Sequence, residues 1–110
     1  CIDWNHQTNR IISGSLDKNI IVWNYSSETN TWKHDIVIIK KSKLSILCVK
    51  WNSRGDKFVA GTSGNQILLG YFSKKDNWWT AERHDFHKSA VTCCNFDPSG
   101  LYVITGSTDL

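Results

Sequence analysis

Short runs of alternating or continuously apolar residues, separated by polar turns, make up nearly all of this chain. No segment of useful length spaces its apolar residues with the period of a helix. In the first part of the chain the predicted strands are Cys1–Trp4, Arg10–Ser13, Ile20–Asn24 and Asp35–Lys40. The polar segments 7–9 and 17–19 between them are rich in residues that favour turns. The pattern predicts an all-β chain.

The same arrangement of strands and turns returns twice further along the chain. The predicted strands of the second unit are Ile46–Trp51, Lys57–Gly61, Gln66–Phe72 and Trp78–Arg83. Those of the third unit are Val91–Phe96 and Leu101–Gly106, with a turn at Pro98-Ser99-Gly100 between them. The third unit stops at Asp109-Leu110, where a third strand is expected to begin.

Equivalent residues of the three units keep constant spacings. Trp4 is matched by Trp51 and Phe96, at offsets of 51 − 4 = 47 and 96 − 51 = 45. The same offsets relate Gly14 to Gly61 and Gly106. A period of about 40 to 50 residues with several strands per unit is typical of a WD-type β-propeller. The first unit even carries the phrase expected of a WD repeat, Gly14-Ser15-Leu16-Asp17-Lys18-Asn19-Ile20-Ile21-Val22-Trp23.

We therefore predict an all-β WD-repeat β-propeller, of which this chain supplies about two and a half blades. The repeat units cover residues 1–44, 45–89 and 90–110. Closed propellers need at least about four blades, so we expect the chain to be part of a longer protein. Propellers are rigid platforms that bind partners, and this favours an interaction protein over an enzyme.

The composition changes this picture little. Of the 110 residues, 40% are hydrophobic and 21% are charged, and the formal net charge is +3. We expect neither a transmembrane helix nor a signal peptide in this stretch, because the apolar runs are too short. The lysines Lys40, Lys41 and Lys43 form a small basic cluster. They are interpreted either as solvated lysines that discourage association of sheet edges or as a patch for an acidic partner or nucleic acid.

The four cysteines also fit the repeat. Cys1, Cys48 and Cys93 occupy the same position of successive units, and we expect all three to be largely buried. Equivalent positions on neighbouring packed sheets lie about 10 Å apart, too far for a disulfide. Cys93 and Cys94 are adjacent on a strand and are expected to point to opposite faces. Free cysteines favour a reducing compartment and therefore an intracellular protein.

Three residues near the end of the chain, His87, Thr105 and Asp109, could suggest a catalytic triad. Their spacing favours a structural network instead, in which His87 before the strand Val91–Phe96 pairs with Asp109 and Thr105. WD repeats pair a histidine and an aspartate in this way, with a strand Ser/Thr and a Trp. The first unit carries the complementary residues Ser13, Asp17 and Trp23. The second unit has Ala60, Gly64 and Gly70 at these places and lacks the network.

Two further groups of residues could form sites. Metal binding by His84, His87, Cys93 and Cys94 is disfavoured, because adjacent cysteines diverge and no paired C-x₂-C spacing is present. No cofactor motif is found either. Trp78 and Trp79 lie on one predicted strand and are expected to point to opposite faces, so at most one of them joins the blade core. The other is a candidate partner anchor, with packing between blades as the alternative.

Several motifs together resemble one particular WD-repeat family. They are Ile2-Asp3-Trp4, Asp17-Lys18-Asn19 before Val22-Trp23, the segment 31–40, Val49-Lys50-Trp51, and Tyr71-Phe72 followed by Asp76-Asn77-Trp78-Trp79. Over nearly its whole length the chain is similar to the WD-repeat subunit (subunit 1) of the actin-related protein 2/3 complex. The double tryptophan after a Tyr-Phe strand is the most specific part of this resemblance.

The resemblance implies a seven-bladed, non-catalytic subunit of an assembly that nucleates branched actin filaments. Its implied partners are the other subunits of that complex and, through the complex, the actin filament and nucleation-promoting factors. It implies a place in the cytoplasm, at the cytoskeleton, with no membrane contact. The alternative function is a WD-repeat scaffold that binds nucleic acid or a ribonucleoprotein through Lys40, Lys41 and Lys43.

Overall fold

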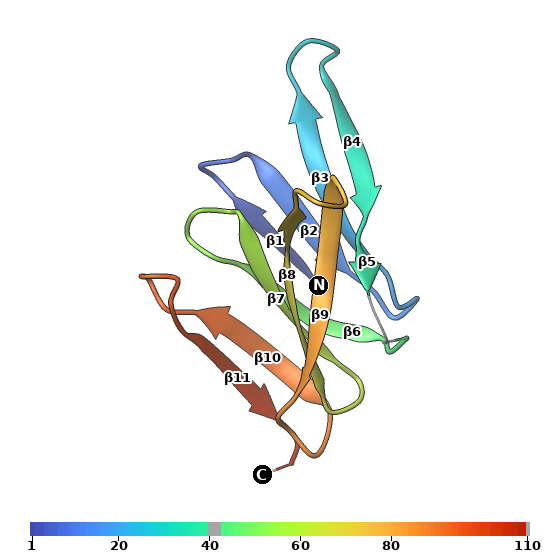
Figure 1. Ribbon diagram of the computed structural model, residues 1–110, viewed down its shortest axis with the longest axis vertical. Helices are drawn as coiled ribbons and strands as arrows, with labels where there is room; N and C mark the ends of the chain where they lie inside the picture. The colour runs from blue at the N-terminus through green and yellow to red at the C-terminus, as the bar shows by residue number, and fades with distance from the viewer. Residues whose placement is uncertain (40–42, 110) are drawn as a thin grey trace.

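The computed structural model describes residues 1–39 and 43–109, and the described residues form strands and turns (Figure 1). The strands fall into three sheets that follow one another along the chain. The first sheet has the order β1-β2-β3-β4, and each strand is antiparallel to its neighbour. Its strands are β1 (Ile2–Asn5), β2 (Arg10–Gly14), β3 (Ile20–Ser26) and β4 (Thr31–Ile36).

The second and third sheets repeat this order as far as the described residues extend. The second sheet consists of β6 (Ile46–Trp51), β7 (Lys57–Thr62), β8 (Gln66–Ser73) and β9 (Trp78–Asp85), with β5 (Ile38–Ile39) added beside β9. The third sheet consists of β10 (Val91–Phe96) and β11 (Val103–Ser107). Gly55 and Gly100 occupy the left-handed backbone region, with φ of 71° and 75°, in the turns that join β6 to β7 and β10 to β11.

The predicted fourth strand Asp35–Lys40 is wrong. The first sheet ends with β4 at Ile36, and the chain then passes to the second sheet. Val37 is buried between the sheets, and its N–H donates to the Ile20 oxygen at 2.9 Å. Ile38 and Ile39 then pair in parallel with Thr80 and Ala81 of β9. One apolar run therefore serves two sheets, which local sequence patterns do not reveal. Lys40 lies outside the described residues.

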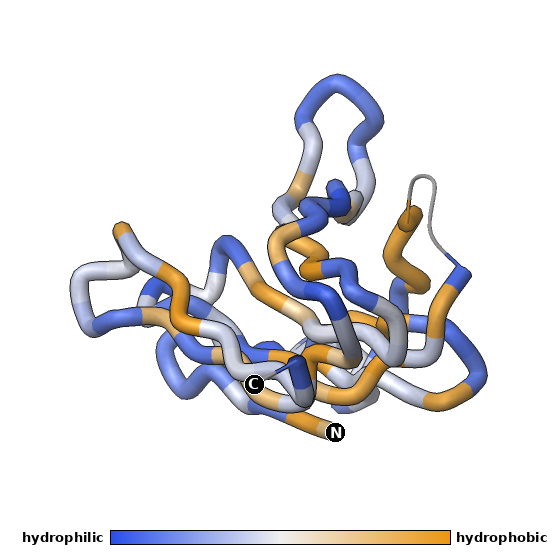
Figure 2. Tube along the Cα trace, turned by 90° about the horizontal axis from the view of Figure 1, so that it is seen from below, coloured by the Kyte–Doolittle hydropathy of each residue, from blue (hydrophilic) through white to orange (hydrophobic). Residues whose placement is uncertain are grey.

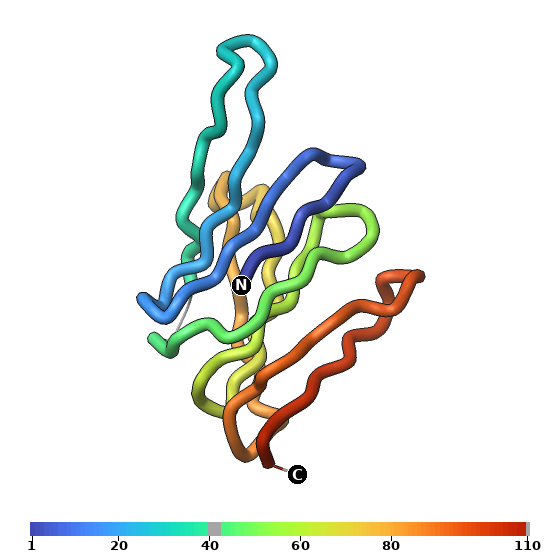
Figure 3. The backbone as a smooth tube through the Cα atoms, turned by 180° about the vertical axis from the view of Figure 1, so that it is seen from behind, coloured from blue at the N-terminus to red at the C-terminus, as the bar shows by residue number. Residues whose placement is uncertain are grey.

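The sheets pack face to face, with β1, β6 and β10 side by side in chain order (Figures 1 and 3). Between the first two sheets lies a core of Ile12, Ile20, Val22, Val37, Ile46, Val49, Trp51, Phe58, Ala60, Leu68, Trp79 and Ala81. A smaller core of Val59, Ile67, Val91 and Cys94 joins the second sheet to the third. Hydrophobic residues follow the strands, and hydrophilic residues occupy many of the turns (Figure 2). The sequence thus folds as blades held together by apolar faces.

A β-bulge recurs at the same place in β6 and β10. The pairing register shifts between Ile46 and Cys48, and again between Val91 and Cys93. An extra residue in the strand keeps Ile46 on the same face as Val49, and Val91 on the same face as Cys94. These faces pack against the preceding sheet in both cases.

The predicted burial of the cysteines is therefore partly wrong. Cys1 and Cys93 are exposed and Cys48 is half-buried, whereas Cys94 is the buried cysteine. The bulge directs Cys94 into the core with Val91 and turns Cys93 to the opposite face. Cys1, Cys48 and Cys93 do occupy equivalent places, since each sulfur lies against the glycine of the next strand, which is Gly14, Gly61 or Gly106. All four cysteines are free thiols.

Candidate functional site

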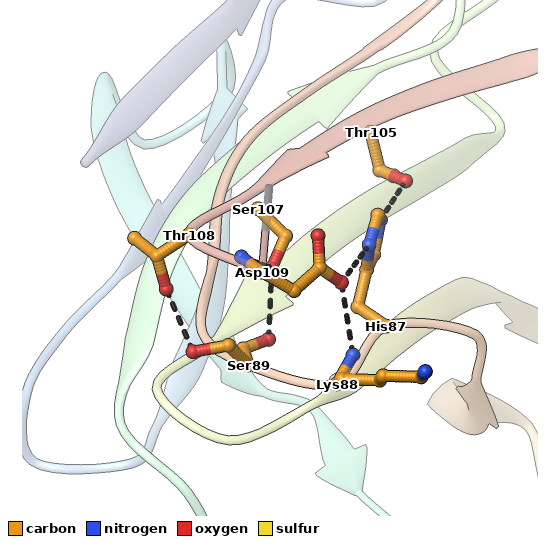
Figure 4. Close-up of polar contacts among 7 residues, drawn as sticks. All are labelled: His87, Lys88, Ser89, Thr105, Ser107, Thr108 and Asp109. Atoms are coloured by element: carbon orange, nitrogen blue, oxygen red, sulfur yellow. Dashed lines mark hydrogen bonds and ion pairs between the residues drawn. The ribbon is translucent and has the colours of Figure 1, made fainter.

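His87 lies in the loop before β10, and its side chain contacts β11 and the turn after β11 (Figure 4). Its Nε2 lies 2.7 Å from Thr105 Oγ1, and its Nδ1 lies 3.0 Å from Asp109 Oδ2. The side chain of His87 is 19% exposed, so these contacts are shielded in part from water. The structure thus brings together the three residues that the sequence singles out in the third unit.

Asp109 has a second partner besides His87, because its Oδ2 also accepts a hydrogen bond from the Lys88 N–H at 2.9 Å. Next to it, the hydroxyls of Ser89 and Thr108 are hydrogen-bonded to each other at 2.7 Å. The Lys88 amide, followed by the His87 side chain, stabilises the carboxylate and lowers the pKa of Asp109. Ser107 Oγ donates to the Ser89 oxygen at 3.1 Å. These bonds hold the loop before β10 against the end of β11 and the turn after it. Thr105 itself is part of β11 and pairs with Cys94 of β10. The arrangement therefore suits a structural clamp.

The first sheet contains the complementary pair of this network. Trp23 Nε1 donates to Ser13 Oγ at 3.0 Å, across the paired strands β2 and β3. Asp17 lies apart from this pair: its Oδ1 accepts the Asn19 N–H at 3.0 Å and so organises the turn between β2 and β3. Trp23 also lies against His34 of β4, with ring centroids 5.4 Å apart.

The second sheet fills the same face with apolar groups. Ala60 and Gly70 stand where the first sheet has Ser13 and Trp23, and Gly64 stands where it has Asp17. Gly70 pairs with Phe58, whose ring occupies the space above the glycine. Gly64 lies in the turn between β7 and β8, next to the end of the Leu44 side chain. The second sheet therefore replaces the polar network by an aromatic core.

Trp79 is the inward residue of the double tryptophan. It is 3% exposed and lies in the core between the first two sheets. Its ring contacts Trp51, Phe58 and Phe72, with centroid separations of 5.5, 6.4 and 5.6 Å. The guanidinium of Arg10 lies 5.4 Å from its centroid, in cation–π contact. This agrees with the expectation that one of the two rings joins the blade core.

Trp78 is the first residue of β9, the strand next to the edge strand β5, and is 39% exposed. Its Nε1 donates to the Ile36 oxygen at 2.7 Å, which ties β9 to the end of β4 in the neighbouring sheet. Ile36 and Ile38 are also exposed, and Ile38 pairs with Thr80 two residues beyond Trp78. We call Ile36, Ile38 and Trp78 the perimeter patch, because they give the junction of the two outer strands an apolar surface.

The predicted basic cluster is placed only in part. Lys43 is exposed, and Lys40 and Lys41 lie outside the described residues. In residues 1–39 and 43–109, no three histidine, cysteine or acidic side chains lie close enough to hold a metal ion. The same residues contain no helix that is long and apolar enough to cross a membrane.

Sequence reasoning missed a set of polar residues at the ends of the inner strands. Asn5, Asn52 and Asp97 are separated by the repeat offsets of 47 and 45. Asn5 and Asn52 are buried, and Asn5 Nδ2 donates to the Asn52 oxygen at 3.2 Å, which links two sheets. The Ser99 hydroxyl, followed by the Tyr102 amide, lowers the pKa of Asp97. Their shared offsets were a signal that could have revealed these positions.

Comparison with known proteins identifies the repeats. The family described as "WD domain, G-beta repeat" matches residues 1–24 and 80–109, which include both parts of the network. The fold is similar to the crystal structure of the C-terminal WD40 domain of Sif2, with a TM-score of 0.67 and 14% sequence identity. That match covers 98% of this chain and 30% of the Sif2 chain. No curated protein matches.

The chain has the all-β fold of WD40-repeat propeller blades. It spans about a third of the length of the propeller chain that it matches. WD40 propellers are in general non-catalytic scaffolds that mediate contacts between proteins. A scaffold of this class is consistent with the structural role of the His87 network and with the exposed perimeter patch.

Proposed function

We propose that this chain belongs to the WD-repeat subunit (subunit 1) of the actin-related protein 2/3 complex. In this proposal it is a non-catalytic structural subunit, located in the cytoplasm at the cytoskeleton, that supports nucleation of branched actin filaments. Its partners are the other subunits of the complex. Contact with the actin filament and with nucleation-promoting factors is made through the assembled complex.

The observation that carries the proposal is the arrangement of Trp78 and Trp79. The double tryptophan is the most specific motif of the resemblance, and its two rings have different surroundings. Trp79 fills the core, while Trp78 adds an exposed apolar ring to the perimeter patch. Exposed tryptophan is favoured at interaction hot spots, so the patch supports a scaffold that docks by its perimeter.

The test is a native purification. The tagged full-length protein, purified from an extract of its own organism and analysed by mass spectrometry, should recover actin-related proteins in stoichiometric amounts. Treatment of a parallel sample with nuclease controls for contacts bridged by nucleic acid. Recovery that survives nuclease supports the proposal, because direct protein contacts do not depend on a bridging strand.

Two results would overturn it. Recovery of RNA-binding factors without actin-related proteins would favour the scaffold for nucleic acid or a ribonucleoprotein, with Lys40, Lys41 and Lys43 as its basic contacts. Recovery of an unrelated protein assembly would retain the WD40 scaffold and remove the actin function.

A further inference from the structure

Two cysteine side chains lie at the boundary between the second and third sheets. Cys48 belongs to β6 and Cys94 to β10, and both lie in the core that joins these sheets. Each thiol also donates to the backbone of the other sheet: Cys48 Sγ to the Val91 oxygen at 3.8 Å and Cys94 Sγ to the Val59 oxygen at 3.7 Å. These reciprocal contacts place both sulfurs inside one interface.

Gly61 makes this close approach possible. A Cβ atom at this position would lie 2.6 Å from Cys48 Sγ and 2.5 Å from the Val91 oxygen. Any side chain larger than hydrogen would therefore push the sulfur or the β10 backbone away. The bulge between Val91 and Cys93 completes the geometry, because it turns Cys94 toward the second sheet. Cys93, its neighbour, is exposed and lies against Gly106.

The two thiols differ in how readily they ionise. The Cys94 side chain, aided by the Gly61 backbone and the Lys50 charge, lowers the pKa of Cys48 against the effect of burial. The Cys48 side chain, followed by burial, raises the pKa of Cys94. Cys48 is half-buried and Cys94 is 8% exposed. The accessible thiol is thus the one that ionises more readily, as expected of a nucleophile paired with a resolving cysteine.

We propose that Cys48 and Cys94 form a peroxide-responsive dithiol that closes into a disulfide between β6 and β10. The Cys48 thiolate attacks a peroxide oxygen, so that an S–O bond forms, the O–O bond breaks, and hydroxide or alkoxide leaves. The Cys94 sulfur then attacks the Cys48 sulfur of the sulfenic acid. An S–S bond forms, the S–O bond breaks, and the departing hydroxide takes the Cys94 proton as water. Two thiols are oxidised and one peroxide is reduced.

Closure joins neighbouring inner strands across 94 − 48 = 46 residues of chain. A covalent link of this kind restricts the unfolded chain and holds the two blades in contact. We expect a rise in Tm of roughly 5 °C on oxidation, reversed by a reducing agent. The WD40 scaffold thereby gains a redox-dependent rigidity at one blade boundary, independent of its partner.

The test maps the link in the folded full-length protein after titration with hydrogen peroxide. Trypsin releases Cys48 in peptide 44–50 and both Cys93 and Cys94 in the peptide that begins at Ser89. Cys93→Ser is the matched control for Cys94→Ser, because the two residues are adjacent and face opposite ways. The linked pair of peptides should form in the wild type and in Cys93→Ser. It should be absent in Cys94→Ser, where a sulfenic-acid probe should label Cys48 instead.

Three outcomes would overturn the proposal. The first is a link that persists in Cys94→Ser, which would assign the bond to Cys93. The second is a link that forms only in urea, where the native contact is lost. The third is direct conversion of Cys48 to sulfinic acid in the wild type with no link formed.

Discussion

At the scale of single residues, Asp109 gives the fold a dependence on pH. The Lys88 amide and the His87 side chain stabilise its charged form and lower the pKa of Asp109. A carboxyl with a depressed folded pKa contributes stability that is present above its unfolded pKa and is lost as pH falls through its folded pKa. The affected window therefore lies below about pH 4.

We expect Asp109→Asn to lower Tm at neutral pH and to lose less stability than the wild type between about pH 4 and pH 2. The two Tm curves should converge at the acid end, where the wild type has lost the carboxylate as well. Asp76→Asn, in the exposed turn between β8 and β9, controls for the loss of one negative charge. Parallel curves for Asp109→Asn and the wild type down to pH 2 would show that the clamp does not depend on this charge.

Gly70 shows how one residue without a side chain replaces the polar network. A Cβ at Gly70 would overlap the ring of Phe58, which is fully buried, so Gly70→Ala should destabilise the fold by about 1–3 kcal/mol. Gly64→Ala is the matched control, since its Cβ would meet only the end of the Leu44 side chain. Urea unfolding measures both. Restoring part of the loss with Phe58→Leu in the Gly70→Ala background would identify the overlap as the cause, and equal losses for both glycines would contradict it.

At the scale of elements, Val37 anchors the segment in which the chain passes from the first sheet to the second. This residue is 4% exposed, between the strand that ends at Ile36 and the strand that pairs with β9. Val37→Ala removes two buried methyl carbons and should cost about 2 kcal/mol. Hydrogen exchange should accelerate at the β9 amides that face β5. Ile38→Ala, at an exposed neighbouring position, should cost less than about 0.5 kcal/mol and leave this exchange unchanged. The reverse order of effects would show that Ile38 anchors the segment.

The elements also show what the sequence can predict. Alternation and turn residues predict an all-β chain and place nearly every strand, because these signals are local. The parallel pairing of Ile38–Ile39 with β9 was not predictable, since it depends on a strand about 40 residues away. The bulges of β6 and β10 were missed as well, and they decide which cysteine is buried. The opposite directions of Trp78 and Trp79 follow from alternation, whereas the choice of the inward ring depends on the neighbouring sheet.

At the scale of the whole molecule, the three sheets form one stack in which each blade uses a different means of packing. The first carries the Ser13–Trp23 pair, the second an aromatic core, and the third the His87 clamp. WD40 propellers in general bind partners through the surface of such a stack. The perimeter patch is the part of that surface to which the proposed assembly assigns a role.

Substitutions of Trp78 and Trp79 should distinguish a contribution to folding from a contribution to assembly. Trp79→Ala should destabilise the protein by about 3–5 kcal/mol, because the ring is buried among other aromatic side chains. Trp78→Ala should leave the protein folded and weaken its binding to the remaining subunits by about 2 kcal/mol, or roughly 30-fold in Kd. Trp78→Phe retains a ring but loses the bond to the Ile36 oxygen, and so measures how much of the effect comes from that bond.

Phe86→Ala is the control for this experiment, since Phe86 is an exposed aromatic residue in the loop beyond the other end of β9. Thermal unfolding and binding to the reconstituted remainder of the complex are measured on the same samples. If Trp78→Ala lowers Tm as much as Trp79→Ala, the patch belongs to the core between blades, because a docking residue contributes only to the bound state. If Phe86→Ala weakens binding and Trp78→Ala does not, partners dock near the loop between β9 and β10, and the patch only protects the outer strands.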